Sequence, residues 1–268
     1  MKELRKRKTS FILHPFKVTR TQRQIEEHRQ GDACIEVHDA AGRPWAGVPV
    51  WVEQETHAFT FGCFVSDLTA LSESDRQRCE ARLNEVFNRL ISAGQAPDPR
   101  AVRVNVPELV HLGRFRRDLD QLAGAGRPLD VHVRGRSVGL GSRPESAAAE
   151  QVAALYALCF AHPGVRAIVW TGFWDGEQGA DGGGLLRTDF APKPAFRYLH
   201  KLIATVWHTR ASGETDRDGR FRFRGYYGDY RVAASVGEAA ASTAVFPFRD
   251  APGGGRFVFR QDTASGAA

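Results

Sequence analysis

The chain has 268 residues, of which 42% are hydrophobic and 25% charged, a composition typical of a globular protein. Its net charge of +6 lies in residues 1–30, which hold nine Lys or Arg and three Glu, whereas the rest of the chain holds 28 of each sign. We therefore predict a basic, disordered leader over residues 1–30, with one helical stretch over 21–30 as the alternative for its end, and we expect no nucleic-acid partner. Because no apolar run reaches about 18 residues, we also expect no membrane span.

The cysteines indicate neither a metal site nor a cofactor. Cys34, Cys63, Cys79 and Cys159 are scattered, without the paired spacing of a zinc site. Both free thiols and one disulfide are compatible with this spacing, so the compartment stays open. The N-terminus lacks the apolar stretch of a secretory signal peptide. We predict no metal and no cofactor.

Residues 31–54 are predicted to form a β-hairpin. The segments 34–38 and 48–53 alternate apolar and polar residues on either side of a turn that contains Gly and Pro. Pro49 donates no backbone hydrogen bond, so we expect the second strand to be an edge strand or to carry a bulge. An isolated hairpin is not stable in water, so this one needs a larger sheet.

Residues 55–208 are predicted to alternate strands and helices, as in a parallel α/β sheet. Four segments read as strands: 57–64, 101–106, 129–133 and 167–170. Four segments read as helices: 74–91, 107–123, 144–160 and 194–203. In 74–91, Leu83, Phe87, Leu90 and Ile91 share one helical face, and Ser74 and Gln77 have capping-box spacing.

The strand 167–170 and the loop after it form the candidate site. The strand is apolar without alternation, which predicts that both of its faces are covered. α/β folds place ligand chemistry at the carboxyl ends of such strands. The loop holds Trp170, Trp174, Asp175 and Glu177, so it offers rings for stacking on a sugar and carboxylates for its hydroxyls. The alternative is a core strand with a buried tryptophan and a solvated acidic turn.

Residues 209–260 are predicted to form a C-terminal β module. Four segments alternate strictly between turns rich in Gly, Asp and Pro: 221–224, 226–232, 243–248 and 256–259. We expect this antiparallel module to pack with the hairpin into one small sandwich. Residues 261–268 are predicted to be a loose tail.

Several motifs resemble glycoside hydrolase family 10, a family of endo-β-1,4-xylanases built on a (β/α)8 barrel. The longest are WTGFWDG (170–176), GLL (184–186) and DFAPKPAF (189–196), which resemble the last strand, loop and helix of that barrel. The pairs FG (61–62) and FN (87–88) resemble its first strand and helix. GYYGDYRV (225–232) resembles the β module of plant-type members, which are usually secreted.

The resemblance places the catalytic nucleophile, a glutamate, at the end of the strand that contains His132. The family pattern reads His-Val-Thr-Glu-Leu-Asp, and the matching segment here reads HVRGRS (132–137), with Gly135 in the position of the glutamate. The stretch that carries the acid/base glutamate has no counterpart, because the similarity jumps from about residue 91 to about residue 106. Glu108, Asp175 and Glu177 are the remaining candidates for a catalytic carboxylate, and a structural role is the alternative for each. His132 is a candidate sugar-binding residue or a core histidine.

The sequence thus predicts an α/β fold: a partial or degenerate (β/α)8 TIM-type barrel with a small flanking antiparallel β-sandwich module. The resemblance implies a glycoside hydrolase-like protein whose partner is xylan or a related oligo- or polysaccharide, with catalysis impaired. Trp170, Trp174, Asp175 and His132 are its expected substrate-binding residues. The alternatives are a non-catalytic carbohydrate-binding protein and a non-functional remnant. Because half a barrel leaves sheet edges open, a homodimer is a further possibility.

Overall fold

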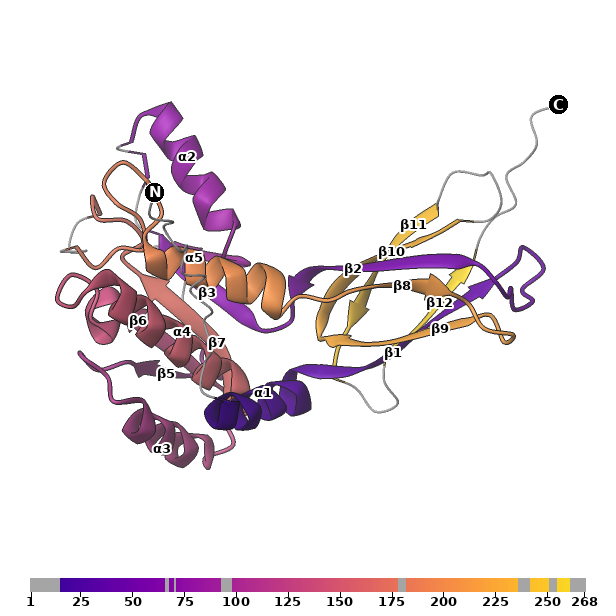
Figure 1. The fold of residues 1–268 in the computed structure, drawn as a ribbon, viewed down its shortest axis with the longest axis horizontal. Helices are drawn as coiled ribbons and strands as arrows, with labels where there is room; N and C mark the ends of the chain where they lie inside the picture. The colour runs from indigo at the N-terminus through magenta and orange to yellow at the C-terminus, as the bar shows by residue number, and fades with distance from the viewer. Residues whose placement is uncertain are drawn as a thin grey trace, which may run out of the picture.

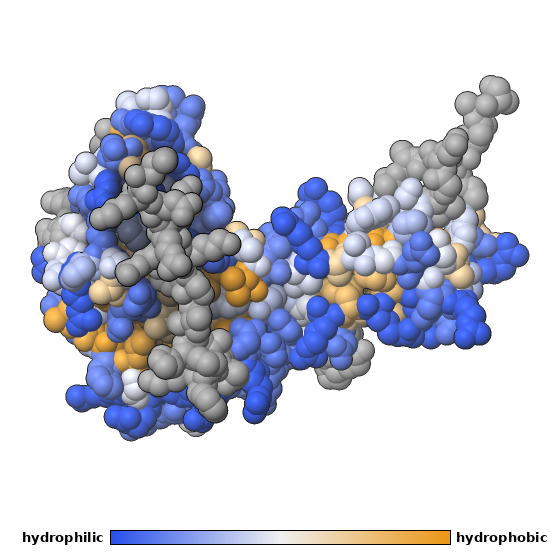
Figure 2. Space-filling view, viewed as in Figure 1, coloured by the Kyte–Doolittle hydropathy of each residue, from blue (hydrophilic) through white to orange (hydrophobic). Residues whose placement is uncertain are grey.

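The computed structural model describes residues 15–65, 68–69, 71–92, 98–177, 182–235, 242–250 and 255–260. These residues form two lobes joined by a narrower waist (Figures 1 and 2). One lobe contains a parallel sheet with helices, and the other contains only strands (Figure 1). The predicted leader and tail fall outside the described residues at 1–14 and 261–268.

The first lobe is built on a five-stranded parallel sheet in the order β4-β3-β7-β6-β5. Its strands are β3 (Thr60–Val65), β4 (Arg89–Ser92), β5 (Val102–Asn105), β6 (Leu129–Arg134) and β7 (Val165–Thr171). The predicted mixed α/β class with a parallel sheet is confirmed, whereas a closed barrel is not shown. β4 and β5 form opposite edges of this sheet, although only the nine residues 93–101 separate them in sequence.

Five helices belong to this lobe: α1 (Pro15–Arg29), α2 (Glu73–Asn84), α3 (Leu112–Ala123), α4 (Glu145–Ala161) and α5 (Pro194–Lys201), which continues into a π-helical turn at Leu202–Val206. α4 packs against α5 and α1. Its inward residues Val152, Leu155 and Tyr156 are fully buried beside alternate residues of the sheet. The main hydrophobic core therefore lies between the sheet and these helices.

The second lobe is a sandwich of two sheets. One sheet has the order β12-β1-β9 and the other β11-β10-β2-β8. The strands are β1 (Gln30–His38), β2 (Pro49–His57), β8 (Arg210–Glu214), β9 (Arg220–Tyr226), β10 (Gly228–Ala234), β11 (Ser242–Phe248) and β12 (Gly255–Arg260). A separate core between the two sheets includes Ile35, Val52, Tyr230 and Phe248.

The predicted hairpin at 31–54 is wrong, because β1 and β2 lie in different sheets of the sandwich. The ten residues 39–48 between them are long enough to pass from one sheet to the other. β2 is an internal strand, between β10 and β8, so it is not the expected edge strand. The alternative of a bulge is closer, because the register with β10 shifts at Glu55, although this is far from Pro49. Pro49 is the first residue of β2, a position where a missing N–H is tolerated. The sandwich is not purely antiparallel either, since β12 runs parallel to β1.

Three helix predictions need correction. Residues 15–29, part of the predicted disordered leader, form α1. The predicted helix 74–91 ends at Asn84, with Ser72 as its N-cap, and Arg89–Ser92 form β4 instead. Pairing with β3 outweighs the helical pattern of Leu90 and Ile91. Pro107 does not start a helix, because α3 begins only at Leu112.

Arg29 joins the end of α1 to the end of α4. Its guanidinium donates hydrogen bonds to the carbonyl oxygens of Phe160, His162 and Val165, each at 2.7 Å. It also lies 4.7 Å from the centre of the Phe59 ring. These acceptors are carbonyls, and burial lowers the pKa of Arg29 to about 10. The interaction neutralises the negative end of α4 and fixes α1 against it.

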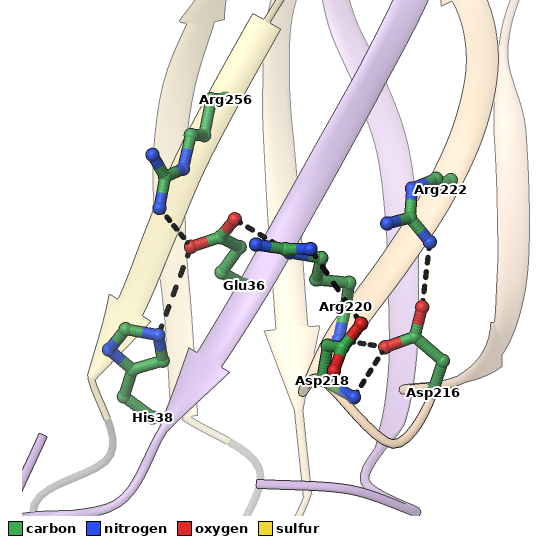
Figure 3. A network of polar contacts seen from close by, with 7 residues as sticks. All are labelled: Glu36, His38, Asp216, Asp218, Arg220, Arg222 and Arg256. Carbon is green, nitrogen blue, oxygen red and sulfur yellow. Dashed lines mark hydrogen bonds and ion pairs between the residues drawn. The ribbon is translucent and has the colours of Figure 1, made fainter. Parts of the chain in front are cut away.

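A buried carboxylate holds three strands of the sandwich together (Figure 3). Glu36 on β1 accepts hydrogen bonds from Arg256 on β12, at 2.6 Å, and from Arg220 on β9, at 3.1 Å. The Arg256 hydrogen bond is the main reason that the pKa of Glu36 lies below its usual value. Asp216 closes the neighbouring turn and binds Arg222 at 2.6 Å. The network thus links residues far apart in the sequence.

Candidate functional site

The two faces of the parallel sheet differ in what they contact. Alternate residues such as Val131, Val133 and Ile168 belong to the core under the helices. The other set points away from that core, and we call it the open face, although Gly62, Ala167 and Val169 in its middle are themselves buried. It comprises Arg103 and Asn105 on β5, Asp130, His132 and Arg134 on β6, Ala167, Val169 and Thr171 on β7, and Gly62 and Phe64 on β3. In a closed barrel this face would line the interior.

His132 lies in the middle of the open face. Its neighbours across the sheet are Asn105 on β5 and Val169 on β7. Its Nδ1 is buried and has no hydrogen-bond partner among the described residues. Burial, followed by the charge of Arg103, lowers the pKa of His132 to about 4. The imidazole is therefore neutral at pH 7 and suits hydrogen bonding better than proton donation.

Arg166 forms a charged cluster at the amino end of the open face, which sequence reasoning missed. Its guanidinium binds Asp130 on β6 at 2.7 Å and Asp98 at 2.5 Å. The hydrogen bond from Arg166 is the largest cause of the lowered pKa of Asp98. Asp98 belongs to the connection between β4 and β5, so this connection contacts the central strand of the sheet. No local motif marks the pair, because 68 residues separate its members.

Gly135 has no room for a side chain. It directly follows β6 and begins a short 3-10 helix, Gly135–Val138. A Cβ atom built on Gly135 would lie 1.8 Å from the carbonyl oxygen of Gly183, far inside van der Waals contact. The loop after β7 therefore occupies the place where the xylanase pattern has its glutamate.

Asp175 and Glu177 each bind groups of the loop after β7. Asp175 accepts hydrogen bonds from the Lys193 ammonium, at 2.7 Å, and from the Gly184 amide, at 3.0 Å. Lys193 is only 4% exposed and also donates to the Gly182 carbonyl. Glu177 accepts from the Phe173 amide at 2.7 Å. Sequence reasoning missed Lys193, whose only signal is its place between two prolines before α5.

The two tryptophans of the loop differ in accessibility. Trp170 is fully buried among the core residues, and its indole N–H donates to the Gly172 carbonyl at 3.0 Å. The prediction that Trp170 stacks on a sugar is therefore wrong. Trp174 is half-buried and packs on Phe190, with 4.8 Å between the ring centres. Glu108 is exposed in the segment between β5 and α3.

The described residues thus offer a hydrogen-bonding surface whose acids are engaged by other groups of the fold. Retaining glycosidases need two carboxyl groups about 5–5.5 Å apart. Asp130, Asp175 and Glu177 each have a partner in the fold, with Arg166, Lys193 and the Phe173 amide respectively. Across the described ranges, no group of three or more His, Cys, Asp or Glu is placed to hold a metal ion. No helix among these residues is long and apolar enough to cross a membrane.

Parts of the chain are similar to xylanases, and a longer part is similar to a regulatory protein. Over 173 residues it is 31% identical to the anti-sigma-I factor RsgI6 of Acetivibrio thermocellus, which covers 64% of this chain and 21% of that protein. Over 74 residues it is 35% identical to endo-1,4-beta-xylanase 1 of Arabidopsis thaliana, which covers 27% of this chain and 8% of that protein. The chain therefore spans about a fifth of the first protein and less than a tenth of the second.

Among solved structures, xylanase 10B from Thermotoga petrophila in complex with xylobiose shares 22% identity with this chain. The match covers 39% of this chain and 35% of that one, with a TM-score of 0.29, too low to establish a common fold. No protein-family model matches the chain. The similarity to xylanases is thus distant and partial.

Proposed function

We propose that this chain is a glycoside hydrolase-like protein that binds xylan or a related plant polysaccharide and has lost most or all hydrolytic activity. The observation that carries the proposal is Gly135, where a loop carbonyl fills the space of the nucleophile that the resemblance implies. The acids of the neighbouring loop support it, because Lys193 and the Phe173 amide already engage them.

The open face is the proposed binding surface. His132 offers a neutral imidazole, and Asn105 and Arg134 add exposed donors and acceptors beside it. Such a polar strip matches the hydroxyl groups of a polysaccharide better than it matches a small apolar ligand. Trp174 is the remaining candidate for stacking, whereas Asp175 is better explained as the anchor of its loop.

The names of the relatives are compatible with binding without cleavage. One is named as a xylanase and the other as an anti-sigma factor, so similar sequence occurs in a hydrolase and in a regulator. This comparison supports binding as the retained property.

Two measurements on the purified protein test the proposal. We expect retention on insoluble xylan, weakened by Arg134→Ala, and reducing-sugar release no faster than in a blank without protein. Arg117→Ala, on exposed α3, is the matched control for the loss of an arginine. Steady release of xylo-oligosaccharides that is abolished by Glu108→Gln or Glu177→Gln would overturn the loss of catalysis. If the protein fails to bind xylan, the proposal that xylan is its ligand is overturned.

A further inference from the structure

The sandwich presents an outer surface on the sheet β11-β10-β2-β8. The outward residues of its four strands form rows across the sheet, set by the strand register. One row is Ser212, Trp51, Ala233 and Thr243, and the next is Arg210, Glu53, Arg231 and Val245. We call these two rows the outer face. Inward neighbours such as Val52 and Val232 belong to the core and hold the strands in this register.

Trp51 is the unusual member of this surface. It is 49% exposed, whereas Trp170 and Trp207 are almost completely buried. Its neighbours in the row, Ser212 and Ala233, are small, so they leave the surroundings of the indole ring open. A depression of about 320 Å³ lies beside it, lined by both of these residues and by Glu53, Arg210 and Arg231.

The charged groups of the depression are already paired. Glu53 binds Arg210 at 2.8 Å, and Arg231 pairs with Glu55. A guanidinium has five N–H donors and a carboxylate about four acceptor sites, so each keeps hydrogen-bonding capacity after pairing. The pairing also holds these groups in place beside Trp51 and leaves little net charge for an ionic ligand.

We propose that the outer face is a saccharide-binding site in which a pyranose ring stacks on Trp51 and its hydroxyls bind Glu53, Arg231 and Ser212. The C–H bonds on one face of a pyranose carry partial positive charge, which matches the negative face of an indole. Its hydroxyls both donate and accept, which matches adjacent carboxylate and guanidinium groups. Exposed Val245 beside Arg231 extends the surface toward a second sugar unit.

An uncharged, hydroxyl-rich ligand fits this chemistry better than a nucleotide or a phosphorylated ligand. An anion would have to compete with Glu53 and Glu55 for the two guanidiniums. An exposed indole beside a shallow depression, with exposed Val245 in the next row, also suits an extended chain of sugars. The inference shares with the proposed function that the ligand is a glycan, but it lies on the other lobe.

The experiment is a titration of the full chain with xylohexaose and cellohexaose, followed by tryptophan fluorescence and calorimetry. We expect Trp51→Ala to weaken binding by about tenfold or more, and Trp51→Phe to keep most of it. The matched control is Leu122→Ala. Leu122 is also an exposed apolar residue, but it lies on α3 in the other lobe, so we expect this variant to bind like the wild type. Glu53→Gln weakens binding without altering the fold, because its side chain is half exposed.

The outcomes separate this inference from the proposed function. If Trp51→Ala loses hexaose binding and keeps the circular dichroism spectrum of the wild type, the outer face is supported as the saccharide-binding site. Unchanged hexaose binding in Trp51→Ala, together with loss in Arg134→Ala, overturns the outer face and leaves the proposed function standing. If the wild-type protein binds neither hexaose but is retained on insoluble xylan, the outer face is overturned alone. If the wild-type protein binds neither the hexaoses nor insoluble xylan, the outer-face site and the proposed function are both overturned.

Discussion

At Gly135 the backbone of another loop occupies the space that a side chain would need. We expect Gly135→Ala to destabilise the protein by about 2 kcal/mol or more, because the Gly183 carbonyl must move. Urea unfolding followed by circular dichroism measures this. Gly126→Ala is the control: nothing lies within 4 Å of its Cβ, and only its positive φ of 72° adds strain. Equal effects at both positions would show that the loop yields easily.

Gly135→Glu tests the same position for chemistry. We expect this variant to fold less stably and to release no more reducing sugar from xylan than the wild type, because the Gly183 carbonyl occupies the space that the new side chain needs. The measurement is a reducing-sugar assay on the folded fraction. Restored hydrolysis would mean that the loop moves aside and that an acid/base residue is present.

Lys193 and Asp175 form a nearly buried ion pair at the centre of the loop after β7. Lys193→Met leaves Asp175 without its cation, and we expect it to destabilise the protein by roughly 3 kcal/mol. The double variant Asp175→Asn with Lys193→Met should recover part of this loss, since it removes the unpaired charge. Thermal melts of the single and double variants measure the difference. Additive losses would contradict a coupled pair.

His57 makes stability depend on pH. Burial lowers its pKa to about 4 in the folded protein, against about 6.5 in the unfolded chain. Below pH 6.5 the unfolded chain takes up a proton that the folded protein does not. The free energy of unfolding therefore falls from about pH 6.5 to about pH 4, by up to roughly 3 kcal/mol. Urea midpoints across this range measure it.

His57→Gln should flatten that pH profile, and exposed His200→Gln should leave it unchanged. His132, whose pKa is also lowered to about 4, accounts for part of any remaining slope. A profile that His57→Gln does not alter would assign the dependence to other groups.

At the scale of elements, Arg29 is the main polar anchor of α1, beside the buried Ile25 on the same helix. Arg29→Met keeps the apolar stem but removes the hydrogen bonds to three carbonyls, and we expect a loss of about 3 kcal/mol. Exposed Arg20→Met, on the same helix, should change stability by less than about 0.5 kcal/mol. Chemical unfolding of both variants measures the contrast, and similar losses would contradict the anchoring role of Arg29.

The sequence predicted elements with strong local patterns and missed those that depend on distant partners. The strand 167–170 and the helix after Pro144 have continuous apolar or periodic patterns, and both are present. Arg89–Ser92 looks helical locally and becomes a strand because β3 lies beside it. β1 and β2 have the alternating apolar and polar residues of a hairpin. Their pairing partners, however, are strands more than 150 residues away in the sequence. The unbroken apolar run of 167–170 already predicted that both faces of this strand are covered, and the burial of Trp170 agrees with that pattern and removes Trp170 from the candidate site.

On the scale of the whole molecule, the sandwich combines both ends of the chain. β1 and β2 pair with β8, β9, β10 and β12, so the N-terminal strands unfold only with the C-terminal ones. We expect hydrogen exchange to protect peptides 30–38 and 49–57 to the same degree as 220–234. Peptides from β6 and β7 should form a separate group, because their core is distinct. If the peptide from β1 showed the same hydrogen-exchange protection as the peptide from β6, and not that of β9 and β10, this grouping would be contradicted.

The connection between β4 and β5 has a consequence for redesign of the chain. It enters at one edge of the parallel sheet and leaves at the other, and the residues on both sides keep their strand pairing. A cassette of three βα units, grafted between residues 92 and 102, would therefore begin and end at the two edges that a closed eight-stranded ring has to join. The order of the strands is thus already compatible with such an insertion.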